Sequence, residues 1–216
     1  MAPRVLYLHG FASGPGSSKG AWLARALSAR GYLLEQPDLN VPTFEALDVR
    51  AMLATVTDAL ARDGRPAVLV GSSLGGFVAA LAATRAPTVA SALLLAPSFD
   101  TARRWRAALD DEAWAQWQRE GSRPYPHYNR KVTLPLHAGF LGTFEGLPAM
   151  PPVPCPVTVI QGLDDALVPP SLVRRWASEN PHARLLEVPD DHQLLRSLDL
   201  VRDEALALLA AVEAQA

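Results

Sequence analysis

The alternation of short apolar runs with helical stripes is the feature of this sequence that most restricts its fold. Six apolar runs predict β-strands at residues 5–9, 32–36, 67–71, 89–96, 156–161 and 184–188. Apolar residues at helical spacing predict helices at residues 18–30, 43–63, 74–85, 170–178 and 193–214. Alternating strands and helices form parallel sheets with helices on both faces. The sequence therefore predicts an α/β fold with a mostly parallel sheet of about six strands.

One segment interrupts this alternation. The 216 residues suit a single domain, 1–216, but residues 100–152 show helical periodicity only over 101–119. This segment also holds the tryptophans Trp105, Trp114 and Trp117. We expect a small cap inserted within the domain, over the strand ends. The three tryptophans are predicted to line a substrate pocket, with packing of the cap onto the body as the alternative.

The charge and cysteine content exclude several classes of function. The net charge is -2 and the pI is about 6.2, so no nucleic-acid or membrane partner is expected. No apolar run reaches the roughly 18–20 residues of a membrane span. The single cysteine, Cys155, cannot form an internal disulfide, which favours a cytoplasmic protein, and no residue spacing indicates a metal site. The predicted partner is a small molecule, and the sequence does not indicate an oligomeric state.

Chemically useful residues follow four of the predicted strands. A parallel sheet places its working site at the carboxyl ends of its strands, so loops that follow strands should converge at one edge. These loops span residues 9–13, 71–76, 162–169 and 189–195. Together they supply a serine, carboxylates, a histidine and backbone amides flanked by glycine.

Ser73 is the candidate nucleophile. The stretch from Gly71 to Gly75 reads Gly-Ser-Ser-Leu-Gly and fits the pattern G-x-S-x-G between a strand and a helix. The glycines permit a sharp turn that exposes the serine hydroxyl, and the following helix adds a positive dipole end. A structural turn is the alternative, and Ser72 is given no chemical role.

His192 is the candidate base because it follows the last strand and precedes a helix. A base of this kind needs a carboxylate that fixes its tautomer and stabilises its cation. Asp164 and Asp165 both follow the fifth strand, and Asp100 is held in reserve. The carboxylates directly before His192 are expected to cap the last helix.

Acyl transfer also requires donors for the developing oxyanion. The backbone N–H of Leu74, next to the candidate nucleophile, is one natural donor. Phe11, which follows His9 and Gly10 after the first strand, is expected to supply the second. His9 is expected to shape this loop and to take no part in the chemistry.

These pieces together resemble the α/β-hydrolase superfamily. YLHGFASGPGSSKG, VGSSLGG, GLDDALVP and DHQLL are similar to small bacterial serine esterases with an HGF-x-S opening loop. The resemblance implies an α/β-hydrolase fold and selects Asp165 as the acid, because the motif G-x-x-D-x-x-V-P carries its acid at that position. It also implies oxyanion donors at Phe11 and Leu74. Two departures are the missing strands before Val5 and the sequence Pro-Asp-Asp before the histidine, where glycines are frequent.

The implied function is a serine hydrolase that cleaves carboxylic esters through a Ser73–His192–Asp165 triad and an acyl-enzyme intermediate, with no metal or cofactor. Its expected partner is a small-molecule ester. Two alternatives stay open: an acyl thioesterase with the same triad, and a non-catalytic protein that uses this fold to bind a ligand.

Overall fold

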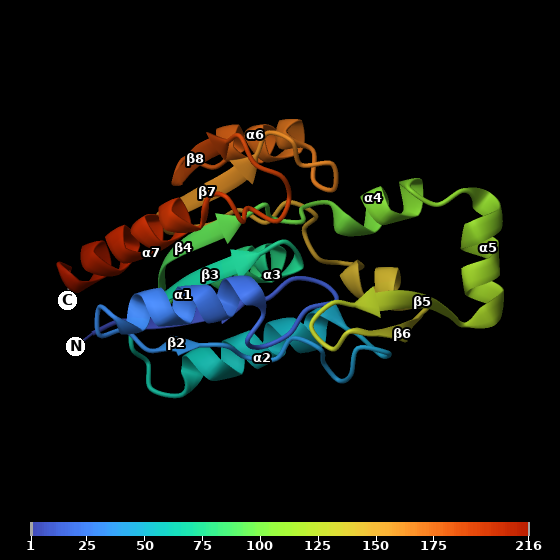
Figure 1. Cartoon of the computed structure of the whole chain (residues 1–216), viewed down its shortest axis with the longest axis horizontal. Coiled ribbons are helices and arrows are strands. Elements are labelled where there is room, and N and C mark those ends of the chain that lie inside the picture. The colour runs from blue at the N-terminus through green and yellow to red at the C-terminus, as the bar shows by residue number, and fades with distance from the viewer. Residues whose placement is uncertain (1, 216) are drawn as a thin grey trace.

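A central parallel sheet organises the molecule (Figure 1). The computed structural model describes residues 2–215, so Met1 and Ala216 of the predicted domain lie outside the described residues. Six parallel strands pair in the order β2-β1-β3-β4-β7-β8, which confirms the predicted sheet. Their bounds are Arg4–Leu8 (β1), Leu34–Glu35 (β2), Ala67–Ser72 (β3), Val89–Leu95 (β4), Val157–Gly162 (β7) and Ala183–Val188 (β8).

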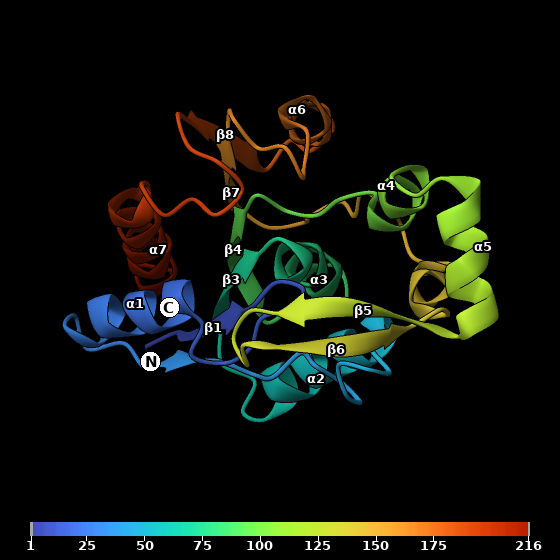
Figure 2. The same ribbon diagram turned by 45° about the vertical axis from the view of Figure 1, so that its right-hand side comes forward.

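Helices cover both faces of this sheet, and β1, β3 and β7 are buried along their whole length. In β1, Val5 and Tyr7 belong to one apolar cluster, whereas Leu6 and Leu8 belong to the other. The first cluster includes side chains of α1 (Ser18–Ser28) and α7 (Leu198–Glu213). The second includes side chains of α2 (Val49–Ala61), α3 (Leu74–Ala83) and α6 (Pro170–Glu179). Figures 1 and 2 show α1 and α7 side by side on their face.

Two helices begin later than the sequence predicts. The helix predicted from residue 43 begins at Val49, because the Asp48 carboxylate accepts hydrogen bonds from the N–H groups of Arg50 and Ala51. The helix predicted from residue 193 begins at Leu198. Leu194, although buried, has a φ of 54°, a left-handed conformation that a helix cannot continue through. In both cases the apolar periodicity identifies which side chains are buried, whereas the residues around the first turn determine where the helix begins.

Residues 100–152 form a compact group of short elements beyond the strand ends (Figure 2). They hold α4 (Thr101–Ala107), α5 (Asp111–Glu120), the antiparallel hairpin β5 (Ser122–His127) and β6 (Val132–His137), and the 3₁₀ helix η1 (Phe140–Phe144). The helical periodicity over 101–119 is divided between two helices, α4 and α5. Asp110 separates the two helices, because its carboxylate caps the start of α5 by accepting from the N–H of Ala113.

The sheet aligns the four candidate loops in two pairs. The strand register pairs Leu8 with Gly71 and Gly162 with Val188, so the loops after β1 and β3, and those after β7 and β8, leave the sheet at matching levels. The strand order reverses at β1, which lies between β2 and β3, and ligands of open α/β sheets bind at such a point. Within residues 2–215, no helix has both the length and the apolar character that crossing a membrane requires.

Candidate active site

Ser73 occupies a tight turn between β3 and α3. Its φ of 54° and ψ of -117° are strained for a residue that carries a side chain, so the surrounding structure must hold it there. Gly75 explains how the turn fits, because a Cβ at this residue would lie 2.1 Å from the carbonyl oxygen of Leu8. A Cβ at Gly71 would likewise lie 2.4 Å from the carbonyl oxygen of Gly75. The G-x-S-x-G spacing thus lets α3 begin directly against the end of β1 and leaves Ser73 half-buried.

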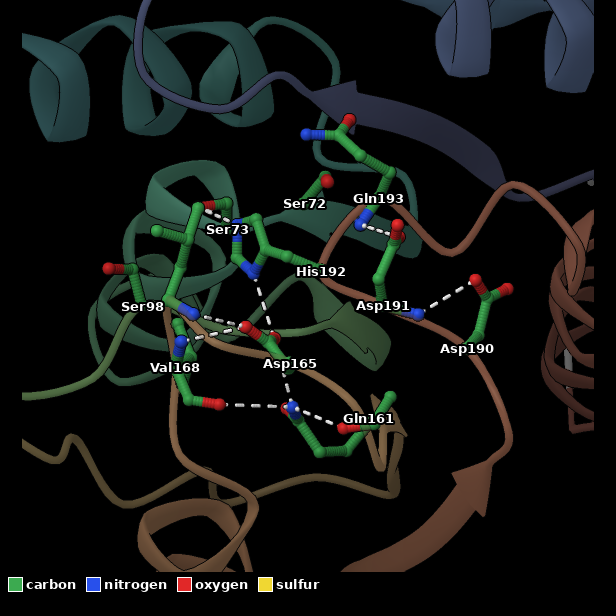
Figure 3. Close-up of polar contacts among 12 residues, drawn as sticks. Ser72, Ser73, Ser98, Gln161, Asp165, Val168, Asp190, Asp191, His192 and Gln193 are labelled. Atoms are coloured by element: carbon green, nitrogen blue, oxygen red, sulfur yellow. Dashed lines mark hydrogen bonds and ion pairs between the residues drawn. The ribbon is translucent and has the colours of Figure 1, made fainter.

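His192 joins Ser73 to Asp165 (Figure 3). Its Nε2 lies 3.0 Å from Ser73 Oγ, and its Nδ1 lies 2.8 Å from Asp165 Oδ2. Since Asp165 accepts from Nδ1–H, the neutral ring is left with Nε2 as acceptor for the serine hydroxyl. The His192 side chain is 12% exposed, and that of Asp165 is fully buried. The three residues come from the turn after β3, the loop after β7 and the loop after β8.

Asp165 is held as a carboxylate by hydrogen bonds. Burial raises its pKa, but the hydrogen bonds from His192, from the backbone of Val168 and from Gln161 outweigh that effect and lower the pKa below its ordinary value. Oδ1 accepts from the N–H groups of Leu167 and Val168 at 2.9 and 2.8 Å. Oδ2 accepts from Gln161 Nε2 at 3.0 Å as well as from His192. This residue is therefore fixed in both charge and orientation.

The other candidate carboxylates lie elsewhere. Asp164 is exposed, and its N–H donates to the carbonyl of Asp190 at 3.0 Å. Asp100 pairs with Arg103 on the first turn of α4. The buried Asp190 accepts from Ser197 Oγ at 2.8 Å and from the N–H of Arg196, so it braces the loop before α7, near the helix it was expected to cap.

Gln161 is a supporting residue that the sequence reasoning missed. It is fully buried near the end of β7, and its Nε2 donates to Asp165 Oδ2, Gly162 O and Val168 O. One amide group thus closes the loop that carries the acid. A glutamine in the otherwise apolar run VTVIQ was the available signal, because a buried amide needs partners.

Phe11 and Leu74 present backbone N–H groups beside the turn that holds Ser73. Within residues 2–215 neither N–H donates to a protein acceptor, and both residues border a cavity of about 10 Å³, room for about one water molecule. A Cβ at Gly10 would lie 3.2 Å from Ser73 Cβ, which brings the loop after β1 against the turn. His9 shapes that loop: its Nδ1 lies 2.9 Å from Gly10 O, and its Nε2 accepts from the N–H of Leu39.

The three tryptophans of the segment 100–152 occupy different positions. The Trp105 ring lies 4.8 Å from the ring of Phe11, edge to face, and also stacks on Tyr125. Trp117 is only 1% exposed, and its indole N–H donates to Leu136 O at 3.0 Å. Trp114 packs edge to face on Trp117 at 5.8 Å. Trp105 is thus the tryptophan that contacts the loop after β1, while Trp117 packs the interior of its own segment.

The architecture is that of the α/β-hydrolase fold, as solved structures confirm. A candidate hydrolase of Agrobacterium vitis superposes with a TM-score of 0.84 at 20% identity, over 96% of this chain and 88% of that one. Alpha/beta hydrolase domain-containing protein 10 from mouse gives 0.81 at 21% identity, over 98% and 91%. Est1E from Butyrivibrio proteoclasticus gives 0.76 at 16% identity, over 99% and 89%.

A comparison of the sequence with known protein families assigns the chain to one family. Residues 4–193 match the uncharacterised protein family UPF0227, so the chain belongs to that family. No curated protein sequence matches it. Among the described residues, no group of three or more His, Cys, Asp or Glu side chains is arranged to hold a metal ion.

Proposed function

We propose that this protein is a serine hydrolase that cleaves carboxylic esters of small molecules through an acyl-enzyme intermediate. The observation that carries the proposal is the position of His192, within 3.0 Å of Ser73 Oγ and 2.8 Å of the buried Asp165 carboxylate. A serine hydroxyl becomes a useful nucleophile only when a positioned base removes its proton. The strained turn at Ser73 supports the same function, because backbone strain of this kind is retained where a side chain must be presented.

In the first half of the reaction, Ser73 Oγ attacks the ester carbonyl carbon while His192 Nε2 takes the hydroxyl proton. The carbonyl oxygen becomes an oxyanion and accepts hydrogen bonds from the N–H groups of Phe11 and Leu74. Asp165 stabilises the imidazolium and stays ionised. The intermediate then collapses: the bond from carbon to the alkoxy oxygen breaks, His192 returns its proton to that oxygen, and the alcohol leaves an acylated Ser73.

In the second half, water replaces the alcohol. His192 takes a proton from water as the water oxygen attacks the acyl carbon, and the same two N–H groups hold the second oxyanion. The bond to Ser73 Oγ breaks, His192 returns the proton to Oγ, and the carboxylic acid leaves. Removing one oxyanion donor in such a site costs roughly two to three decades in rate.

The substrate class follows from the apolar surroundings of the oxyanion donors. Trp105 and Tyr125 both pack edge to face on Phe11, at 4.8 and 5.4 Å. Rings at this point favour a short or medium acyl group or an aromatic ester. Est1E, which shares the fold, has been solved with ferulic acid bound. We place the reaction in the cytoplasm, since the one cysteine of this chain cannot form an internal disulfide.

Labelling with a fluorophosphonate, followed by mass spectrometry, tests the proposal. The wild type is expected to gain one adduct, on Ser73. Ser73→Ala should gain none, and His192→Ala should react more slowly by roughly two to four decades. Ser178→Ala is the matched control, because it removes the hydroxyl of an exposed serine on α6 and should label like the wild type.

Absence of an adduct on folded wild-type protein would contradict the proposal and favour a ligand-binding role. A panel of matched oxygen and sulfur esters, with feruloyl and short alkanoyl groups, then separates an esterase from a thioesterase. Faster turnover of the oxygen esters supports the esterase. A preference for the sulfur esters would assign the same triad to thioester cleavage.

A further inference from the structure

Lys19 is a buried cation that the proposed chemistry does not use. It is the second residue of α1 and only 7% exposed. Two physical effects oppose this placement, because burying an ammonium group is costly and the first turn of a helix carries a positive dipole end. Ordinary packing would place an apolar side chain here, so the position calls for an explanation.

The Lys19 ammonium reaches the residue next to the candidate nucleophile. Its Nζ donates to Ser72 Oγ at 3.0 Å, in the interior. Ser72 is the last residue of β3 and is buried beside Ser73. Tyr7, on the neighbouring β1, completes the cluster: burial raises the pKa of its phenol, while hydrogen bonds with Ser17 and Ser72 act in the opposite direction. The cluster thus ties α1 and β1 to the strand that ends at the turn.

Charges of the loop that carries the candidate base act on the same ammonium. Burial lowers the pKa of Lys19 from 10.5 to about 8, and attraction by Asp190, Asp191 and Asp165 opposes the fall. Asp190 and Asp191 directly precede His192, as Figure 3 shows, and Asp165 is its hydrogen-bond partner. Asp190 is itself buried and anchored on Ser197. Lys19 therefore bonds the residue beside the candidate nucleophile and is attracted by the carboxylates around His192.

We propose that Lys19 is a positioning residue of this hydrolase: its cation holds Ser72 on one side and attracts the carboxylates around His192 on the other, and so keeps Ser73 in register with His192. The inference rests on the proposed function and extends it to a residue outside the triad. Lys19 touches none of the reacting atoms and acts through Ser72 and the His192 loop. The charged form is the one that performs this role.

A pH dependence follows from the charge. The charged groups that act on Lys19 are Asp165 from the loop after β7, and Asp190 and Asp191 from the loop after β8. Tyr7 from β1 shares Ser72 with it. The pKa values of Asp165 and Asp190 are lowered, whereas that of Lys19 is about 8, so Lys19 is the group expected to lose its charge near pH 8. Activity should then decline on the alkaline side, in a range where a neutral imidazole base gives a constant rate.

Lysine substitutions test the inference, and the chain supplies its own control. The sequence has two lysines, Lys19 and Lys131, and Lys131 is exposed at the hairpin between β5 and β6. Lys19→Met and Lys131→Met therefore change the net charge equally. The measurements are the rate constant of fluorophosphonate labelling and kcat and KM for a p-nitrophenyl ester, from pH 6 to 9.5, together with thermal unfolding.

Lys19→Met should lower the labelling rate and kcat at pH 7 by roughly 10- to 100-fold, the cost of a small misplacement of reacting groups, and leave KM nearly unchanged. The activity of Lys19→Met should show no decline at alkaline pH, because the titrating group is gone. The Tm of Lys19→Met should equal or exceed that of the wild type, because the costly buried charge is gone. Lys19→Arg, which keeps the charge, should recover part of the rate. Lys131→Met should behave like the wild type in every measurement.

Three other outcomes would contradict either the role of Lys19 or the proposed function. A wild-type rate and pH profile in Lys19→Met, with Ser73→Ala inactive, would overturn the inference and leave the proposed function intact. A rate and a Tm that fall together would reduce Lys19 to a structural residue. Activity that survives in Ser73→Ala would instead refute the proposed function itself.

Discussion

Replacing Asp165 by asparagine is the sharpest single perturbation of this site. The carboxylate accepts two backbone N–H groups at Oδ1 and two side-chain donors, from Gln161 and His192, at Oδ2. An amide has one oxygen, so its NH₂ group must face one of these pairs. The backbone N–H groups cannot change, whereas His192 can shift its proton from Nδ1 to Nε2. The amide oxygen should therefore face the backbone and its NH₂ group should face His192.

This orientation reverses the role of the histidine. Nδ1 would accept from the amide, and Nε2 would carry the proton and could no longer take one from Ser73 Oγ at 3.0 Å. Trapping the base in the wrong tautomer costs about 10⁴-fold in kcat, or about 5 kcal/mol of transition-state stabilisation. Since Gln161 also loses an acceptor, we expect the free energy of unfolding to fall by about 1–3 kcal/mol.

The assay combines ester hydrolysis at pH 7.5, fluorophosphonate labelling and chemical unfolding. Asp164→Asn is the matched control, because it removes the same charge from the adjacent, exposed residue. Asp164→Asn should keep the kcat of the wild type within about twofold. The reasoning is refuted if Asp165→Asn keeps kcat within about tenfold of the wild type while it stays folded, or if the two variants lose activity equally.

Three further predictions follow from the same contacts. Gly75→Ala should lower the free energy of unfolding by more than about 3 kcal/mol, since its methyl would lie 2.1 Å from the carbonyl oxygen that ends β1. Gly142→Ala is the control: its methyl would meet only a side-chain atom at 4.0 Å, and denaturant unfolding should show a loss of under about 1 kcal/mol. Trp105→Ala should raise KM more than it lowers kcat for aromatic esters, because its ring packs on Phe11, and equal KM values would contradict this. The lowered pKa of Asp165 makes its carboxylate stabilising above the unfolded pKa of about 3.9, so stability should fall as the pH drops below about 4, and less steeply in Asp165→Asn.

The fold could be predicted from the sequence because its main signals are local. The strands β1, β3, β4 and β7 are short, mostly apolar runs, and a strand buried on both faces requires no alternation. Helix ends were less predictable. Asp48 and Asp110 cap helices inside stretches whose apolar periodicity continues through them, so the pattern located buried side chains correctly and helix boundaries wrongly.

The hairpin of β5 and β6 was not predicted, for a physical reason. Pro124 and Pro126 lie in β5 and Pro135 lies in β6, and proline normally argues against a strand because it cannot donate to a sheet. A two-stranded ribbon has two free edges, so a proline can sit where no hydrogen bond is needed. The tip of this hairpin bonds to the loop after β1, through the N–H of Tyr128 and the carbonyl of Ala12, a contact between distant residues that no local pattern contains.

The site could be located from the sequence because several of its residues are fixed by backbone contacts that only glycine permits. A Cβ at Gly162 would lie 2.4 Å from the carbonyl of Asp190, so the loops that carry the acid and the histidine touch at their backbones. Gly75 performs the same role between the serine turn and β1. Side-chain partners such as Lys19 and Gln161 lack such a signature, because many residues can be buried and only the three-dimensional contacts distinguish those that serve the site. These glycines made the serine turn and the loop of the acid visible in the sequence, and the family resemblance selected Asp165, while the side chains that support the site required the structure.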